Sequence, residues 1–238
     1  MKIVAMIPAR YAASRFPGKL MKMLGDKSVI RHTHDNTVST GLFDEVWVIT
    51  DSDIIYDEIK MHGGNALMSV KEHECGSDRI AEAAAQMDVD IIVNVQGDTP
   101  FVKRKPLQQL IELFNDKTVE VASMMRPLAE KELIENPNIV KVVTDLNMNS
   151  LLFSRNVIPY PRNESIAIVH YEHIGIYAFT KQALLKFTKW PVTPLEDAEK
   201  IECLRFLEYG IPLRMTIVDY KGVGIDTPED LKRAVKLL

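Results

Sequence analysis

The stretch that most constrains the fold is residues 3–19, where a short apolar run turns abruptly into a polar, basic loop. The first five apolar residues show no polar alternation, which is typical of a strand buried on both faces in a parallel sheet. Pro8 lacks a backbone donor and is expected to end this strand. Small residues then separate three cations, so the loop is a candidate polyphosphate site, the alternative being a solvated surface loop. The cations are Arg10, Arg15 and Lys19.

The composition is that of an ordinary globular protein, with 238 residues, 46% of them hydrophobic and 26% charged. No apolar run approaches the roughly 20 residues of a membrane-spanning helix, and the first residues do not resemble a signal peptide. We therefore expect a cytoplasmic protein with no membrane partner. The two cysteines, Cys75 and Cys203, predict neither a zinc site nor a disulfide framework. A net charge of -4 argues against broad nucleic-acid binding.

Strands and helices alternate through the first half of the chain, which predicts a parallel sheet joined by right-handed crossovers. Ser28 is expected to cap a helix that ends near Thr40, before Gly41, and Ser77 is expected to cap another. Helices are predicted between apolar strands at 45–50, 65–69, 90–95 and 119–125.

The alternation changes after residue 125. Predicted strands at 139–144, 151–155 and 171–179 have little helix between them, which indicates an antiparallel or mixed patch. Helices are predicted at 182–187 and from 194 or 195 to 209, a strand at 214–218, and a last helix capped by Thr227. No linker rich in Gly, Ser or Pro divides the chain, so we expect one domain over residues 1–238 with an added lobe at about 127–195.

Two aspartates are candidate magnesium ligands. Asp98 follows a buried strand, and Gly97 before it permits close backbone approach. Asp226 lies just ahead of a helix start, and the alternative is that it is only a turn residue or an extra cap. Magnesium is commonly held by one or two carboxylates together with phosphate oxygens and water.

Other polar residues are ambiguous on sequence alone. His173 and Tyr177 share a face if their strand is regular and could line a polar pocket, or they could simply pack. Ser77 and Arg79 could donate hydrogen bonds to a base, although a plain helix cap explains Ser77 equally well. Arg155 could meet a carboxylate ligand or a surface acid. Acids such as Glu196 and Glu199 are favoured near a helix start in any case.

Seven motifs, taken together, make the chain resemble the 3-deoxy-manno-octulosonate cytidylyltransferases. In order they are IPARYAASRFPGK, VNVQGD, PNIVKVV, FSRNVIPY, HIGIYAF, PLEDAEKIECLRFLEYG and GVGIDTPEDL, which together span nearly the whole chain. The resemblance implies an α/β nucleotidyltransferase with a three-layer, doubly wound, mostly parallel sheet of Rossmann-like type. It also implies a small antiparallel or mixed lobe used for dimerisation. The implied activity joins CMP from CTP to an eight-carbon acidic ketose, with Mg2+, in a homodimer that serves lipopolysaccharide biosynthesis.

The same resemblance assigns roles residue by residue. Catalysis is implied for Arg10, Lys19, Asp98 and Asp226, with Asp98 and Asp226 as the magnesium ligands. CTP binding is implied for Pro8, Ala9, Arg10, Ser14, Arg15, Lys19, Ser77, Arg79, Gln96 and Gly97. Sugar binding is implied for Arg15, Gln96, Arg155, His173, Tyr177, Glu196 and Glu199.

Three positions depart from the family pattern. Thr99 replaces the usual Glu after the QGD aspartate, Cys75 stands where Ser is common, and Cys203 where Gln is common. Thr99 leaves the acceptor open between 3-deoxy-manno-octulosonate (Kdo) and its 8-amino analogue. The rivals are a transferase for another ulosonic acid, such as sialic acid, and a catalytically degenerate nucleotide-binding protein. A Rossmann dehydrogenase is disfavoured because no GxGxxG follows the first strand.

Overall fold

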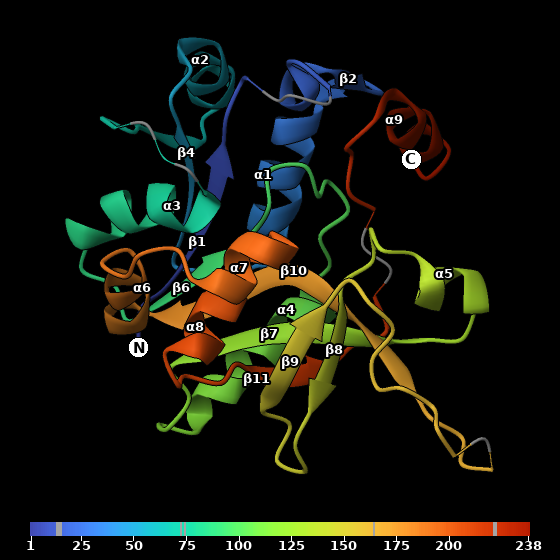
Figure 1. Ribbon diagram of the computed structural model, residues 1–238. Helices are drawn as coiled ribbons and strands as arrows, with labels where there is room; N and C mark the ends of the chain where they lie inside the picture. The colour runs from blue at the N-terminus through green and yellow to red at the C-terminus, as the bar shows by residue number, and fades with distance from the viewer. Residues whose placement is uncertain (13–15, 72, 74, 164, 221–222) are drawn as a thin grey trace. The chain divides into compact units, whose positions relative to one another are not determined.

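The computed structural model describes residues 1–12, 16–71, 73, 75–163, 165–220 and 223–238. By its internal contacts the chain divides into two compact units. Figure 1 labels helices and strands by their number in chain order. The first unit comprises Met1–Leu107 with Lys221–Leu238, and the second comprises Gln108–Tyr220. The lobe expected at about 127–195 lies within the second unit. The expectation of one domain with an added lobe stays a prediction, because a division by contacts does not test how the units behave.

The first unit contains a parallel sheet in the strand order β6-β1-β4-β5. The helices α1 and α2 join strands that succeed one another in one direction, and they contact each other. Helix α3 returns from β5 to β6, so right-handed crossovers place it on the opposite face. The predicted α/β class with a doubly wound, parallel arrangement is confirmed. The elements are β1 (Ile3–Ala9), α1 (Val29–Ser39), β4 (Glu45–Thr50), α2 (Asp53–Met61), β5 (Asn65–Met68), α3 (Gly76–Ala85) and β6 (Ile91–Asn94).

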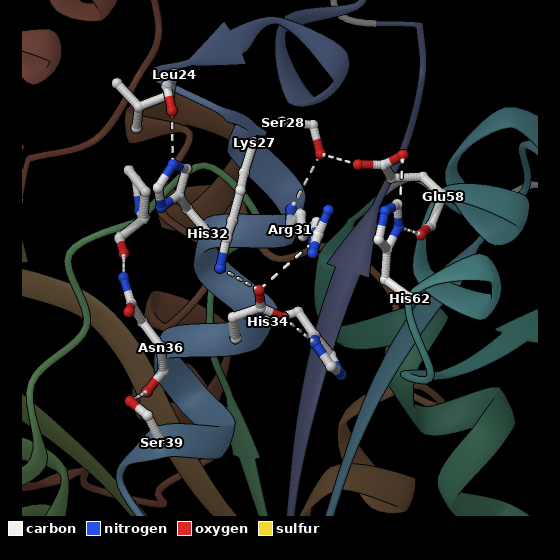
Figure 2. Close-up of polar contacts among 12 residues, drawn as sticks. Leu24, Lys27, Ser28, Arg31, His32, His34, Asn36, Ser39, Glu58 and His62 are labelled. Carbon is white, nitrogen blue, oxygen red and sulfur yellow. Dashed lines mark hydrogen bonds and ion pairs between the residues drawn. The ribbon is translucent and has the colours of Figure 1, made fainter.

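Short elements and caps complete the first unit. As predicted, Ser28 caps α1: its hydroxyl accepts a hydrogen bond from the Arg31 amide at 3.3 Å. The same hydroxyl donates to Glu58 on α2, and Figure 2 shows this link between the two helices. The last helix, α9 (Pro228–Val235), begins with a capping box between Thr227 and Asp230. The remaining short elements are η1 (Lys19–Met21), β2 (Met23–Leu24) and β3 (Lys27–Ser28).

Two predicted boundaries in the first unit are wrong. Pro8 does not end β1, which runs on to Ala9 and pairs there with β4. β6 pairs with β1 only as far as Met6, so the missing amide of Pro8 falls where the strand has a single neighbour. Helix α3 starts earlier than predicted, with Cys75 as its N-cap, which places Ser77 inside the helix.

The second unit contains a mixed sheet. Strand β7 pairs in parallel with β11 and antiparallel with β10, which also pairs antiparallel with β8; β8 pairs antiparallel with β9. The predicted mixed patch is therefore confirmed. Helix α4 (Arg104–Glu112) contains the division between the units. The other elements are η2 (Leu113–Asn115), β7 (Val121–Leu128), α5 (Lys131–Glu135), β8 (Lys141–Thr144), β9 (Ser150–Ser154), β10 (His170–Thr180), α6 (Lys181–Phe187), α7 (Pro194–Glu199), α8 (Leu204–Glu208) and β11 (Arg214–Ile217).

The single helix predicted from 194 or 195 to 209 is also wrong, because α7 and α8 are separate. Lys200 adopts the left-handed conformation with φ 52° and ends α7. The carbonyls that would continue the helix are used elsewhere: Arg155 donates to the Glu199 carbonyl at 2.7 Å and to the Lys200 carbonyl at 3.4 Å. Within the described ranges, the helices are too short or too polar to cross a membrane.

Candidate active site

A cavity of about 230 Å³ opens at the carboxyl ends of β1 and β6, entirely within the first unit. Ligands of open α/β sheets bind in the crevice formed by the loops that follow the carboxyl ends of the strands. Nine of the predicted site residues line it, namely Pro8, Ala9, Arg10, Lys19, Arg79, Gln96, Gly97, Asp98 and Asp226.

The centre of the site is an ammonium group between two carboxylates. Nζ of Lys19 lies 2.6 Å from Oδ2 of Asp98 and 2.8 Å from Oδ1 of Asp226. Burial alone would lower the pKa of Lys19, but the two carboxylates outweigh it and raise that pKa above its ordinary value. Lys19 is therefore charged at neutral pH. Asp98 and Asp226, which are 79 and 207 positions from Lys19 along the chain, thus meet at one cation.

Backbone contacts fix the positions of the two aspartates. The Ile225 amide donates to the Asp98 carbonyl at 2.9 Å, which joins the loop of Asp226 to the end of β6. The Thr33 hydroxyl on α1 donates to the Gly97 carbonyl at 2.9 Å. A Cβ on Gly97 would lie 3.0 Å from the carbonyl oxygen of Pro8, which is tighter than most Cβ contacts, so glycine favours this close approach of the loop to β1.

The other residues predicted to bind CTP differ in whether their side chains are free to contact a ligand. Arg10 is exposed and forms no hydrogen bond or ion pair with any residue that the structure describes. Arg79 is buried, and its guanidinium donates to Ser69 and Asp51, each at 2.6 Å. Ser77 is fully buried and is not among the residues that line the cavity. Ser14 and Arg15 lie outside the described residues.

Sequence reasoning missed several residues of the cavity wall. Phe16, Leu20 and His73 were not singled out, and Cys75 was noted only as a departure from the family pattern. The proximity of His73 depends on a hydrogen bond to Glu82, nine residues away on α3, and no local pattern signals it. Thr99 follows Asp98 in a turn that its amide closes onto the Gln96 carbonyl at 3.1 Å.

In the second unit, His173 and Tyr177 form a buried aromatic cluster. Their ring centres lie 5.4 Å apart, and the ring centre of Phe153 lies 4.8 Å from that of His173. Burial lowers the pKa of His173 to about 3, so the ring is neutral. Nε2 of His173 lies 2.9 Å from the Ser123 hydroxyl. The two rings meet even though the strand is irregular, with a register shift between Ile174 and Tyr177.

Cys203, the third departure from the family pattern, lies against the same cluster. Its thiol is fully buried, which raises its pKa, and the hydrogen bond that it shares with Tyr177 opposes that effect only in part. The neutral thiol thus takes part in the packing of Tyr177.

Arg155 and Glu199 form a second group in this unit. The Glu199 carboxylate accepts from the Ser154 hydroxyl at 2.6 Å and from the Arg155 amide at 2.8 Å. The buried ammonium of Lys141 donates to the carbonyls of Asn136, Ile139 and Arg155. Arg155 is thus held by backbone and side-chain contacts, and its predicted contact with the sugar stays a prediction.

Glu196 forms an internal ion pair. Both oxygens of its carboxylate accept hydrogen bonds of 2.6 Å from the Arg205 guanidinium. Glu196 also completes a capping box with Thr193 at the start of α7. Its burial and these partners describe a structural role, and its predicted contact with the sugar is untested.

Known proteins resemble the chain over its full length. A family model described as cytidylyltransferase matches residues 4–217. A 3-deoxy-manno-octulosonate cytidylyltransferase of Flavobacterium johnsoniae is 55% identical over 241 residues, covering 100% of this chain and 99% of the relative. One of the same name from Myxococcus xanthus is 41% identical, with 100% and 96% covered. The chain belongs to the 3-deoxy-manno-octulosonate cytidylyltransferase family.

Solved structures agree with this family membership. A structure described as CMP:2-keto-3-deoxy-manno-octonic acid synthetase complexed with CTP aligns with a TM-score of 0.94 at 34% identity, over 100% of this chain and 98% of that one. A 4-diphosphocytidyl-2C-methyl-D-erythritol synthase from Anaerococcus prevotii aligns with a TM-score of 0.64 at 18% identity, which shows a shared fold only. The family is therefore set by sequence and fold together, and the chain is a CTP-dependent nucleotidyltransferase.

The donor set of this cytidylyltransferase site fits magnesium. The Lys19 ammonium lies within 2.8 Å of both carboxylates, so the structure itself places a cation between Asp98 and Asp226. Carboxylate oxygens are hard ligands of the kind that Mg2+ prefers. In the described part of the chain, no three His, Cys, Asp or Glu side chains are grouped to hold a metal. Phosphate oxygens and water would have to complete the coordination.

Proposed function

We propose that this chain transfers CMP from CTP to the anomeric hydroxyl of Kdo and releases pyrophosphate. The observation that carries the proposal is the Lys19 ammonium between Asp98 and Asp226, in a cavity that Arg10 also lines. Two cations and two carboxylates around one space suit a triphosphate that arrives with a divalent metal. The names of the relatives support CTP and Kdo as the substrates. The product would supply lipopolysaccharide biosynthesis.

In the reaction, the anomeric oxygen forms a bond to the α-phosphorus of CTP. The bond from that phosphorus to the oxygen bridging to the β-phosphate breaks, pyrophosphate leaves with the electron pair, and the hydroxyl proton passes to water. Both reactants are anions, so positioning and charge neutralisation would lower the barrier most. Arg10 and Lys19 would bind the triphosphate oxygens, and no side chain has to act as a nucleophile.

We infer that Mg2+ is the cofactor and that Asp98 and Asp226 would hold it. When bound, it would offset phosphate charge and make a coordinated hydroxyl more acidic. Lys19 would then exchange at least one carboxylate partner for a phosphate oxygen. The Lys19 ammonium, now 2.6 and 2.8 Å from the two carboxylates, ends a flexible four-carbon stem, which supports such an exchange of partners.

Two further properties are proposed from the family resemblance. The first is a homodimer formed through the lobe at about 127–195, which sedimentation equilibrium of the purified chain would test. A mass equal to one chain at micromolar concentration would reject it. The second is a cytoplasmic location, supported by the proposed use of CTP.

The deciding experiment is an acceptor panel with pyrophosphate detection. The protein is incubated with CTP, Mg2+ and one of three acceptors: Kdo, its 8-amino analogue or sialic acid. Pyrophosphate release with Kdo supports the proposal, whereas release with sialic acid alone favours the rival transferase. CTP binding with no release from any acceptor favours the degenerate nucleotide-binding protein.

The same assay tests the two aspartates. Asp98→Asn and Asp226→Asn should each lower turnover by roughly 100-fold or more at saturating Mg2+, because each removes a charged ligand. Asp57→Asn, on the exposed side of α2, is the matched control and should leave turnover unchanged. A near-normal rate in either site variant would remove that residue from the proposed metal site.

A further inference from the structure

The wall of the cavity contains a histidine to which the family resemblance assigned no role. His73 lines the cavity, and its side chain is only 10% exposed. Its Nε2 lies 2.5 Å from an oxygen of the Glu82 carboxylate on α3. The other oxygen of that carboxylate accepts from the Val70 amide at 2.8 Å. Glu82 therefore links the histidine ring to the Val70 amide.

The Glu82 carboxylate determines which nitrogen of His73 carries the proton. Burial would raise the pKa of Glu82, but hydrogen bonds from the Val70 amide and from His73 keep it below its ordinary value. An ionised carboxylate accepts hydrogen bonds and cannot donate one, so Nε2 of His73 must carry hydrogen. Whenever that is the only hydrogen on the ring nitrogens, Nδ1 is an acceptor. In the described part of the chain, no residue donates to Nδ1.

An acceptor backed by a carboxylate is poorly suited to a phosphate. Phosphate oxygens are themselves acceptors, and the cations for them come from Arg10 and Lys19. The loop of His73 follows β5, which lies three strands from β6 in the sheet order. His73 and Asp98 therefore line the cavity from different loops, and with Asp98 proposed to hold the metal, His73 is available to the nucleoside.

We propose that His73 is a specificity-determining residue that accepts a hydrogen bond at Nδ1 from the exocyclic amino group of cytosine, and that Glu82 is its positioning residue. Cytosine presents an N4 amino donor where uracil presents an O4 acceptor. The acceptor at Nδ1 therefore matches CTP and faces an unfavourable oxygen in UTP. A site that satisfies a donor rejects an analogue that lacks it. This inference rests on the proposed function, because it assumes that CTP occupies this cavity.

The first test compares CTP and UTP binding by calorimetry in the presence of Mg2+ and without sugar. His73→Phe keeps a flat ring and removes the acceptor. It should weaken CTP binding about tenfold, as expected for one hydrogen bond, and should change UTP binding by less than twofold. His62→Phe is the matched control, because His62 lies outside the cavity wall, and it should bind both nucleotides as the wild type does. Equal loss for both nucleotides, or no loss, would overturn the assignment.

The second test uses Glu82→Gln to reverse the hydrogen-bond direction. The Val70 amide needs an acceptor, so the amide oxygen of the glutamine would face it and the amino group would face His73. Nε2 would then accept, and Nδ1 would carry hydrogen, which suits the O4 of uracil. The ratio of CTP to UTP affinity should fall, with UTP binding strengthened. A variant that weakens both nucleotides alike would show that Glu82 has only a structural role.

Failure of this inference is distinguishable from failure of the proposed function. If the wild type releases no pyrophosphate from CTP, the proposed function fails whatever the variants bind. If the wild type turns over CTP with Kdo and the selectivity of His73→Phe is unchanged, only the role of His73 is lost.

Discussion

The guanidinium of Arg205 donates two hydrogen bonds of 2.6 Å to Glu196 while it lies 4.0 Å from the ring centre of Phe187. Both side chains of the ion pair are at most 10% exposed. Removing one partner would leave a buried, unpaired charge, so Arg205→Met should lower the free energy of unfolding by about 3 to 5 kcal/mol. Arg205→Lys should not restore it, because an ammonium cannot donate the two parallel hydrogen bonds or stack on the ring.

Urea denaturation of these variants measures the effect. The double variant Glu196→Met/Arg205→Met is the control, because it removes both charges together. It should be more stable than the sum of the single losses predicts. A loss of less than about 1 kcal/mol in Arg205→Met would contradict a coupled, desolvated pair.

Stability should fall in mild acid because of His173. Its pKa is about 3 in the folded protein and 6.5 as an ordinary value, so the unfolded chain binds a proton first as pH falls. The loss begins near pH 6.5, proceeds at up to about 1.4 kcal/mol per pH unit, and ends near the folded pKa. His173→Gln should show a shallower decline of unfolding free energy between pH 6.5 and 4.5. Parallel curves for wild type and variant would exclude His173 as the cause.

The close approach at Gly97 predicts a strong effect of one methyl group. In Gly97→Ala the new Cβ would lie 3.0 Å from the Pro8 carbonyl and 3.3 Å from Ile30, so the loop that carries Asp98 must move. We expect about 1 to 3 kcal/mol of destabilisation and weaker CTP binding. Gly175→Ala is the matched control, because no described atom lies within 4 Å of its added Cβ. Thermal unfolding and CTP titration measure both effects, and equal behaviour of the two variants would contradict the prediction.

Local sequence signals predicted much of the fold. They failed where contacts with residues distant in the sequence determine where a strand or helix ends. Ser28 capped α1 as predicted, because the cap hydrogen bond is local. Pro8 was expected to end β1, but the extent of its two neighbouring strands permits it to continue. At the break near Lys200, the carbonyls of Glu199 and Lys200 accept hydrogen bonds from Arg155, which precedes Lys200 by 45 positions in the sequence. No pattern within a short window contains such information.

The same distinction applies to the site. The topology of a parallel sheet brings the ends of β1 and β6 together, which accounts for the meeting of Lys19 and Asp98, whereas Asp226 was placed with them only by the family resemblance. The contact of His73 with Glu82 does not follow from strand order, since it depends on how one loop folds back on α3. The ion pair of Glu196 with Arg205 was not predicted either. Acidic residues are favoured near any helix start, so the position of Glu196 gave no sign of a tertiary partner.

Lys19 provides a test of how the site is charged before the substrate arrives. Its ammonium partly neutralises Asp98 and Asp226, so Lys19→Met should leave two carboxylates facing each other without a cation. Turnover of CTP should fall by about 10- to 100-fold, the range expected for a charge-assisted contact with phosphate. Without nucleotide, however, the variant should bind Mg2+ more tightly than the wild type. Binding to the folded state alone raises stability, so Mg2+ should raise the Tm of Lys19→Met more than that of the wild type. Identical Tm responses to Mg2+ in the two proteins would show that the ammonium and the metal do not share these carboxylates.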